Sequence, residues 1–218
     1  MKLNLIKWTI GTAAALALAT AAQAADNWVR LASKPGCKVL MDGTSSIHDW
    51  TVEGAIIKGF FEVEPEFLTD KTLKSVKSLT TKEVNPKAEI SIPLRSLKSG
   101  KQKMDEIMLE AMKATEHKDI IYKLKEMVLK GEVAASGAAK FDAKGELTVA
   151  GVAKPCDMEV ALDRVDDAKV KFTGTAKLKM TDFSITPPSP TVITTPGITS
   201  TSPASWLSPW MAKPATCR

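Results

Sequence analysis

The chain has 218 residues, of which 44% are hydrophobic and 25% are charged, with 30 Lys and Arg against 25 Asp and Glu. This length is enough for one domain with a sizeable core, and the lysines are spread along polar faces, which argues against nucleic acid as a partner. The two histidines lack metal-ligand spacing, and no nucleophile elbow, phosphate loop or dinucleotide fingerprint occurs. Composition and motifs therefore indicate neither an enzyme nor a protein with a metal or cofactor.

The N-terminal segment 1–24 has the pattern of a cleaved signal peptide. Lys2 and Lys7 provide a positive start, residues 8–22 are mostly apolar, and an Ala-Gln-Ala cleavage site ends the segment. The apolar stretch is shorter than the ~20 residues of a membrane span and is rich in Ala. We therefore predict export to the periplasm, with secretion as an alternative, and a mature chain that begins at Ala25.

Short runs that alternate apolar and polar residues follow, each closed by a turn signal. A long strand is predicted over 50–63, with a change of parity beside Gly54 that indicates a bulge or a bend. A further strand is predicted over 76–79. Another covers 90–94, where Pro93 indicates an edge or an irregular pairing.

The period then changes to that of a helix, predicted over Gln102–Lys113. Its apolar face is rich in methionine, with Met104, Met108 and Met112 on it. A methionine-rich face either packs in a core or forms a deformable apolar surface. We expect this amphipathic helix to cover a flank or mouth of the fold, with Met108 and Met112 facing a ligand.

Alternation resumes after the helix. A strand is predicted over 120–129, with a change of parity before Met127, and a hairpin turn over 142–145. The clearest strand comes last, and its apolar face consists of Val170, Phe172, Gly174, Ala176, Leu178 and Met180. Seven or eight such strands predict a mainly β domain, built as a sandwich or a closed antiparallel barrel.

Four stretches carry a resemblance to a known family. They are residues 43–50 (GTSSIHDW), 95–100 (RSLKSG) with the helix that follows, 147–152 (LTVAGV) and 180–183 (MTDF). In this order and spacing the chain resembles the YceI-like family of exported polyisoprenoid-binding proteins, from about Cys37 to Pro188. The resemblance implies a single lipocalin-like β-barrel over 25–188, with an apolar interior that holds a polyprenyl lipid or an isoprenoid quinone and with no catalytic residues.

The resemblance does not assign individual contacts, so candidate ligand-binding residues are chosen by strand parity and by the helix face. They are Trp50, Ile90, Ile92, Leu94, Met108, Met112, Tyr122, Leu124, Val160, Leu162, Phe172, Leu178, Met180 and Phe183. His48 and Asp49 are headgroup candidates at the mouth, and the alternative is that they satisfy a loop backbone. The Tyr122 hydroxyl is a further polar candidate.

The expected partner is the lipid itself, as ligand rather than cofactor, with transient membrane contact and either a monomer or a homodimer. The alternative is a periplasmic stress-response module whose apolar interior is a filled core. The two differ in interior volume, since walls that meet at native density leave no room for a ligand.

Three cysteines remain to be placed. An exported protein keeps disulfides, so Cys37 and Cys156 either form a bridge across the fold or stay separate thiols. Cys217 is the odd third cysteine, and it belongs to the tail.

The tail, residues 189–218, departs from the family pattern. Residues 186–218 are more than half Pro, Ser and Thr, and the closing strand Gly-Asp-x-Val-x-Ile that the resemblance implies is missing. A frameshift near 194–197 would account for this, and the alternative is a genuine disordered extension. Because prolines recur from Pro190 to Pro214, we expect irregular structure after Pro190 and a barrel left open at its seam.

Overall fold

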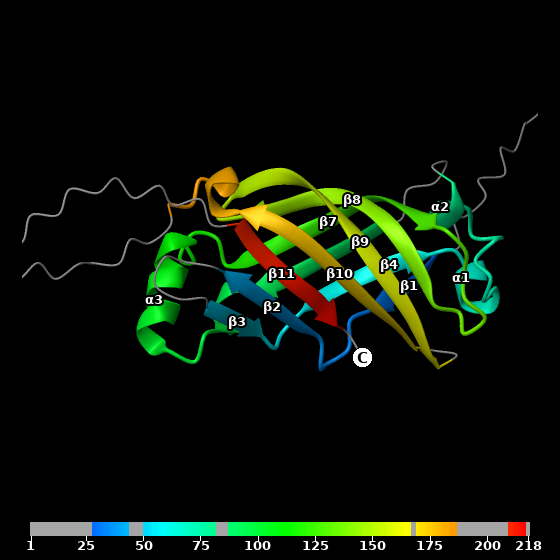
Figure 1. The fold of residues 1–218 in the computed structure, drawn as a ribbon, viewed down its shortest axis with the longest axis horizontal. Helices are drawn as coiled ribbons and strands as arrows, with labels where there is room; N and C mark the ends of the chain where they lie inside the picture. The colour runs from blue at the N-terminus through cyan, green and yellow to red at the C-terminus, as the bar shows by residue number, and fades with distance from the viewer. Residues whose placement is uncertain (1–27, 44–49, 82–86, 167–168, 187–208, 217–218) are drawn as a thin grey trace, which may run out of the picture.

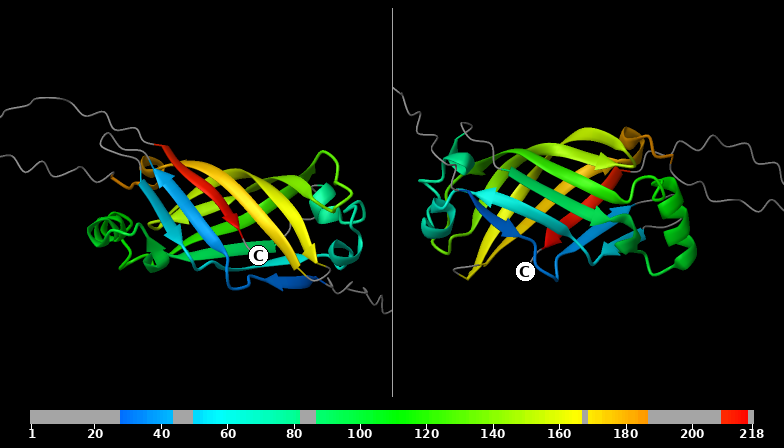
Figure 2. Two further views of the ribbon diagram at one scale, coloured as in Figure 1. Left: turned by 60° about the horizontal axis from the view of Figure 1, so that its bottom comes forward. Right: turned by 180° about the vertical axis from the view of Figure 1, so that it is seen from behind.

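The structure, a computed structural model, describes residues 28–43, 50–81, 87–166, 169–186 and 209–216. These residues form one antiparallel sheet of eleven strands in the order β1-β4-β5-β7-β8-β9-β10-β11-β2-β3-β6, which curls into a barrel (Figures 1 and 2). The strands are β1 (Val29–Ala32), β2 (Lys38–Gly43), β3 (Trp50–Gly54), β4 (Lys58–Val63), β5 (Lys87–Pro93), β6 (Leu97–Lys98), β7 (Asp119–Lys130), β8 (Ala139–Val149), β9 (Val152–Asp166), β10 (Lys169–Lys179) and β11 (Pro209–Thr216).

Short helices lie at the two ends of the barrel. They are α1 (Glu66–Thr69), α2 (Lys77–Thr80), α3 (Gln102–Ala111) and the 3₁₀ turns η1 (Leu94–Ser96) and η2 (Met180–Phe183). In Figure 1, α3 covers one end of the barrel, and α1 and α2 lie at the other. None of the helices in the described ranges has the length and apolar character that crossing a membrane would require.

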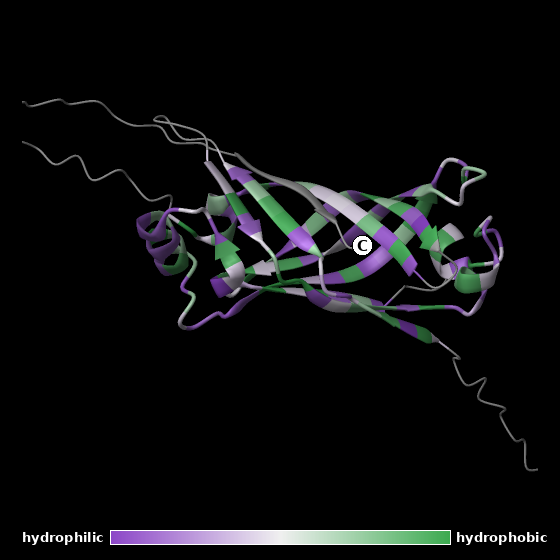
Figure 3. Ribbon diagram, turned by 90° about the horizontal axis from the view of Figure 1, so that it is seen from below, coloured by the Kyte–Doolittle hydropathy of each residue, from purple (hydrophilic) through white to green (hydrophobic). Residues whose placement is uncertain are grey.

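The alternation of apolar and polar residues explains the barrel. On β8 the burial alternates at every residue from Ala139 to Val149, because successive side chains point to opposite faces of the sheet. Figure 3 shows the same alternation of hydrophobic and hydrophilic positions along the strands. The predicted fold class, a mainly β lipocalin-like barrel with an amphipathic helix at one end, is confirmed.

One local prediction of strand geometry holds. The change of parity before Met127 is a β-bulge, where the pairing of β7 with β8 shifts between Leu124 and Glu126. The β8–β9 hairpin turns through Ala150 and Gly151, whose φ angles are 50° and 80°. Two consecutive positive φ angles match the type I′ turn that suits the twist of a hairpin.

Four predicted elements need correction. The strand expected over 50–63 is two strands, β3 and β4, separated by residues 55–57. The strand expected over 76–79 is the short helix α2, because Val76 and Leu79 are buried three residues apart, as on one helical face. The turn expected over 142–145 lies within β8, and the helix expected to reach Lys113 ends at Ala111.

The tail joins β10 to β2, so the open seam and the irregular structure predicted after Pro190 are wrong for residues 209–216. Strand β11, which lies beyond the predicted domain boundary at 188, pairs with β10 on one side and with β2 on the other. Its two prolines fall where a strand tolerates them: Pro209 is its first residue, and Pro214 lies in the shift of register between Lys213 and Thr216. The predicted frameshift concerns the gene and stays a prediction.

Candidate functional site: the barrel cavity

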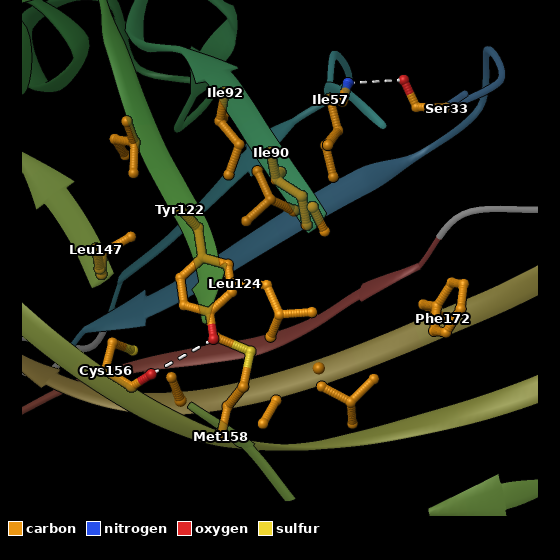
Figure 4. A pocket seen from close by; sticks show the side chains of 18 of the residues that line it. Ser33, Ile57, Ile90, Ile92, Tyr122, Leu124, Leu147, Cys156, Met158 and Phe172 are labelled. Carbon is orange, nitrogen blue, oxygen red and sulfur yellow. Dashed lines mark hydrogen bonds between the residues drawn. The ribbon is translucent and has the colours of Figure 1, made fainter. Parts of the chain in front are cut away.

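The interior of the barrel is a cavity of about 590 Å³. Side chains from β4, β5, β7, β9 and β10 point into it, as Figure 4 shows for Ile90, Tyr122, Leu124, Met158 and Phe172. Ile90 still exposes 36% of its surface although it lies on this inner wall. The walls therefore do not meet, and apolar side chains that would bury one another in a filled core instead face open space.

The apolar face of β10, which the sequence predicted most clearly, forms one wall of the cavity. All six of its residues from Val170 to Met180 line the cavity. Ten of the fourteen candidate ligand-binding residues lie on the wall, and they are Ile90, Ile92, Met112, Tyr122, Leu124, Val160, Phe172, Leu178, Met180 and Phe183. That they contact a ligand stays a prediction.

Four candidates do not line the cavity. Leu94 and Leu162 are fully buried, in the packed clusters at the α3 end and at the α1–α2 end respectively. Met108 also packs in the cluster at the α3 end, and Trp50 lies against it at the start of β3. Parity correctly placed the leucines on the inner face, but parity does not tell how far along the barrel a residue lies. His48 and Asp49 lie outside the described residues.

Among the wall residues that the sequence reasoning missed are two groups with an identifiable cause. The inner face of β8, with Ala143, Leu147 and Val149, was overlooked because residues 142–145 resemble a turn. The alternation that runs through the whole strand would have found it. The second group comes from β1 and the turn after it, from Arg30 to Lys34, where the run is too short to show a period.

Two buried side chains on the inner wall, Tyr122 and Cys156, carry polar atoms. The Tyr122 hydroxyl donates a long hydrogen bond of 3.5 Å to the carbonyl oxygen of Cys156, drawn in Figure 4. Burial raises the pKa of Tyr122, with smaller contributions from Cys156 and Asp157, so the phenol is neutral at physiological pH. Burial, followed by the charge of Asp157, also raises the pKa of the Cys156 thiol, which keeps it in its unreactive protonated form.

The absence of a side chain at Gly145 leaves room for the Tyr122 ring. A Cβ atom on Gly145 would run into the Tyr122 ring and would lie 2.6 Å from the carbonyl oxygen of Lys123. The tyrosine therefore lies across a glycine on the neighbouring strand, where any larger residue would push it out of position.

The α3 end of the barrel is held by a buried carboxylate. Asp105, in the first turn of α3, accepts hydrogen bonds from the backbone N–H of Ser99 (2.8 Å) and from its hydroxyl (2.6 Å). These bonds, opposed by desolvation and helped by Lys98 at 3.7 Å, lower the pKa of Asp105. Met112 directly follows the helix and lines the cavity.

The other end is closed by an aromatic cluster. Phe67 of α1 packs edge-to-face on Phe61, with ring centroids 6.0 Å apart, and stacks on Phe172 at 6.5 Å. Arg164 of β9 donates a hydrogen bond of 2.7 Å to the carbonyl oxygen of Phe67 and so ties α1 to the barrel. Because Phe61 and Phe172 line the cavity while Phe67 is fully buried behind them, the cavity ends here.

Of the two alternatives for Cys37 and Cys156, neither a bridge between them nor two separate thiols is correct. Cys156 is a free, buried thiol on the cavity wall, whereas Cys37 is disulfide-bonded. The third cysteine, Cys217, lies outside the described residues. Across the described ranges, no three His, Cys, Asp or Glu side chains are grouped closely enough to hold a metal ion.

The cavity and its barrel can now be compared with known proteins. The profile of the YceI-like domain matches residues 44–200. The chain belongs to the YceI-like domain family. This finding confirms the predicted family resemblance, and the match covers most of the barrel. The comparison with curated proteins found no match.

Solved structures show the same fold at low sequence identity. BcnA of Burkholderia cenocepacia is 12% identical with a TM-score of 0.58, and the match covers 83% of this chain and 94% of that one. A polyisoprenoid binding domain from Saccharophagus degradans, implicated in plant cell wall breakdown, is 10% identical with a TM-score of 0.55, and the match covers 87% of this chain and 98% of that one. At these identities the likeness establishes the YceI-like fold.

Proposed function

We propose that this YceI-like protein is an exported, non-enzymatic carrier that holds a polyisoprenoid lipid or an isoprenoid quinone in its barrel. The observation that carries the proposal is the apolar cavity of about 590 Å³. Ile90 lies on its wall and remains partly exposed to the open space. The polyisoprenoid binding domain from Saccharophagus degradans, which shares the fold, supports the choice of ligand class.

The energetics favour a cavity that holds an apolar chain over one that is left open to water. A lipid chain buried against this wall gains ~0.8 kcal/mol per methylene, so ten methylenes contribute about 8 kcal/mol before the costs of association. The stress-response module with a filled core does not fit this volume.

Two observations support an exported location. The segment 1–24 has the charge pattern and cleavage site of a signal peptide. The disulfide of Cys37 is a bond that persists in oxidising compartments such as the periplasm. A carrier in that compartment takes up its lipid during a transient contact with a membrane.

Native mass spectrometry and lipid extraction of the protein purified from its own host test the proposal. We expect one long isoprenoid chain bound per barrel. The variant Ala176→Trp, which adds bulk on the wall, should lower lipid occupancy, whereas Thr175→Trp, one residue away on the exposed face of β10, should not. Wild-type protein that carries no lipid and binds none on addition would refute the carrier function.

A further inference from the structure

The charged residues on the wall of the cavity are all positive. Among the described residues that line it are Arg30, Lys34, Lys58, Lys169 and Lys179, and no Asp or Glu. The chain as a whole has 25 acidic residues against 30 basic ones, so composition does not explain this selection. An apolar interior with a purely cationic set of side chains matches a ligand that is apolar along its length and anionic at one point.

Two of these cations, Lys34 and Lys58, lie on neighbouring segments of the chain. The pairing of β1 with β4 ends at Ala32 and Phe60, and beyond it Ser33 and Gly59 are joined by two hydrogen bonds of 3.0 Å, one from the Ser33 N–H to the Gly59 carbonyl oxygen and one from the Gly59 N–H to the Ser33 hydroxyl. Lys34 and Lys58 are the next residues after this contact on each segment, both exposed and neither with an ion-pair partner in the described ranges. Like charges on neighbouring segments repel each other, and an anion between them removes the repulsion.

This pair lies where the cavity reaches the surface. On β1, Leu31 points inward and packs with the core, while Arg30 points outward and lies 3.6 Å above the ring of Phe60. Residues from both faces of β1 line the cavity, so the space passes around this strand. In the described residues β1 pairs with β4 alone, which leaves its other edge beside the opening.

We propose that the bound lipid has an anionic headgroup, a phosphate or a carboxylate, which binds between Lys34 and Lys58 while the chain lies in the barrel. This inference rests on the proposed carrier function and adds the headgroup chemistry and its place. The ammonium group of a lysine binds a phosphate or carboxylate oxygen through charge-assisted hydrogen bonds. Arg30 lies on the same strand, two residues before Ala32, and adds positive potential, although it already forms an ion pair with Glu62 at 3.2 Å.

Binding of matched lipids to the delipidated full-length protein tests the inference. The probes are a polyprenyl phosphate and the polyprenol of the same chain length, then a fatty acid and its alcohol, with inorganic phosphate alone as the headgroup without a chain. We expect the anionic member of at least one pair to bind about tenfold more tightly than its neutral partner, and this preference should shrink at high salt. The pair that shows the preference identifies the headgroup as phosphate or carboxylate.

Two double variants then locate the headgroup. In Lys34→Gln/Lys58→Gln the preference should fall to about onefold while the neutral lipid binds as before. In Lys123→Gln/Lys177→Gln, which removes the same charge from exposed positions off the cavity wall, the preference should persist.

Each outcome separates the two proposals. Equal binding of anionic and neutral lipids in the wild type, or a preference that survives in Lys34→Gln/Lys58→Gln, would overturn the headgroup site and leave the carrier function standing. Inorganic phosphate that binds as tightly as the polyprenyl phosphate would reveal a free-anion site and also overturn it. Failure of every lipid to bind would refute the carrier function, and the headgroup site with it.

Discussion

Two isoleucines with nearly equal exposure allow a sharp test of the cavity. Ile90 exposes 36% of its surface into the cavity, whereas Ile107 exposes 37% on the outer side of α3 and does not line the cavity. We predict that Ile90→Asp strongly weakens lipid binding and that Ile107→Asp leaves it nearly unchanged. Both variants exchange the same residue type at the same exposure, so their own stabilities should fall by similar amounts.

The expected magnitude follows from what the ligand covers. Full burial of an isoleucine contributes ~1.5–3 kcal/mol, so covering the exposed third of Ile90 contributes roughly 0.5–1 kcal/mol to binding. A carboxyl group left without a partner against the lipid costs a further ~1–3 kcal/mol. The sum, about 1.5–4 kcal/mol, corresponds to lipid binding that is roughly 10- to 1,000-fold weaker.

Titration of each delipidated variant with a fluorescent isoprenoid measures the loss directly, and urea denaturation of the same samples supplies the stability control. If Ile90→Asp and Ile107→Asp retain lipid equally, the open space beside Ile90 is not where the chain binds. The cavity argument would then be wrong.

Three further predictions concern single groups. Gly145→Ala should lower the free energy of unfolding by about 1–3 kcal/mol, because its Cβ meets the Tyr122 ring and a backbone carbonyl. Gly174→Ala meets the flexible Met158 sulfur at 3.1 Å and Val160 Cγ2 at an ordinary contact distance of 3.6 Å, so its cost in urea denaturation should be smaller. The pKa of Asp105 is lower in the folded protein than its unfolded value of ~3.9, so the ionised carboxylate stabilises the fold above that pH. This contribution is lost as the pH falls through the folded-state pKa. The free energy of unfolding of the wild type should therefore fall more than that of Asp105→Asn between pH 6 and pH 2. Because the pKa of the Cys156 thiol is raised, this cysteine should react slowly with maleimide at pH 7. Bound lipid should slow the reaction further, since Cys156 lines the cavity. A reaction rate that lipid does not change would place the ligand away from Cys156.

The sequence predicted those parts of the barrel where the period of two is long and uninterrupted. β10 and β7 were found with their inward faces, and even the bulge of β7 showed as a change of parity. β8 was divided because Asp142 and Gly145 are residues typical of turns. In the structure Asp142 faces outward, 3.3 Å from Lys130, and Gly145 makes room for Tyr122, so each serves a contact with a neighbouring strand. These contacts join neighbouring strands, so the residues adjacent in the sequence do not reveal them.

The site was harder to predict than the fold, because parity gives the face of a residue but not its depth or its neighbours. Leu162 and Phe172 are directly paired and both point inward, yet only Phe172 lines the cavity while Leu162 is buried in the cluster at its end. Lys34 and Lys58 are 24 positions apart and look like ordinary surface lysines in the sequence. Their juxtaposition depends on the register of β1 with β4, which only the folded chain reveals.

The two ends and the side of the barrel differ in a way that bears on how a ligand enters. The α1 end is held by the hydrogen bond from Arg164 to the carbonyl oxygen of Phe67, and the α3 end is held by packed apolar side chains such as Met108 and Leu94. Opening the α1 end would leave the buried carbonyl without its partner, at about 1–3 kcal/mol, and opening the α3 end would expose apolar surface to water. Among the described residues, entry beside β1 breaks no such hydrogen bond, since the cavity already passes around that strand. A lipid that enters there chain first leaves its headgroup at Lys34 and Lys58, so the least costly route of entry and the cationic pair coincide at one place on the barrel.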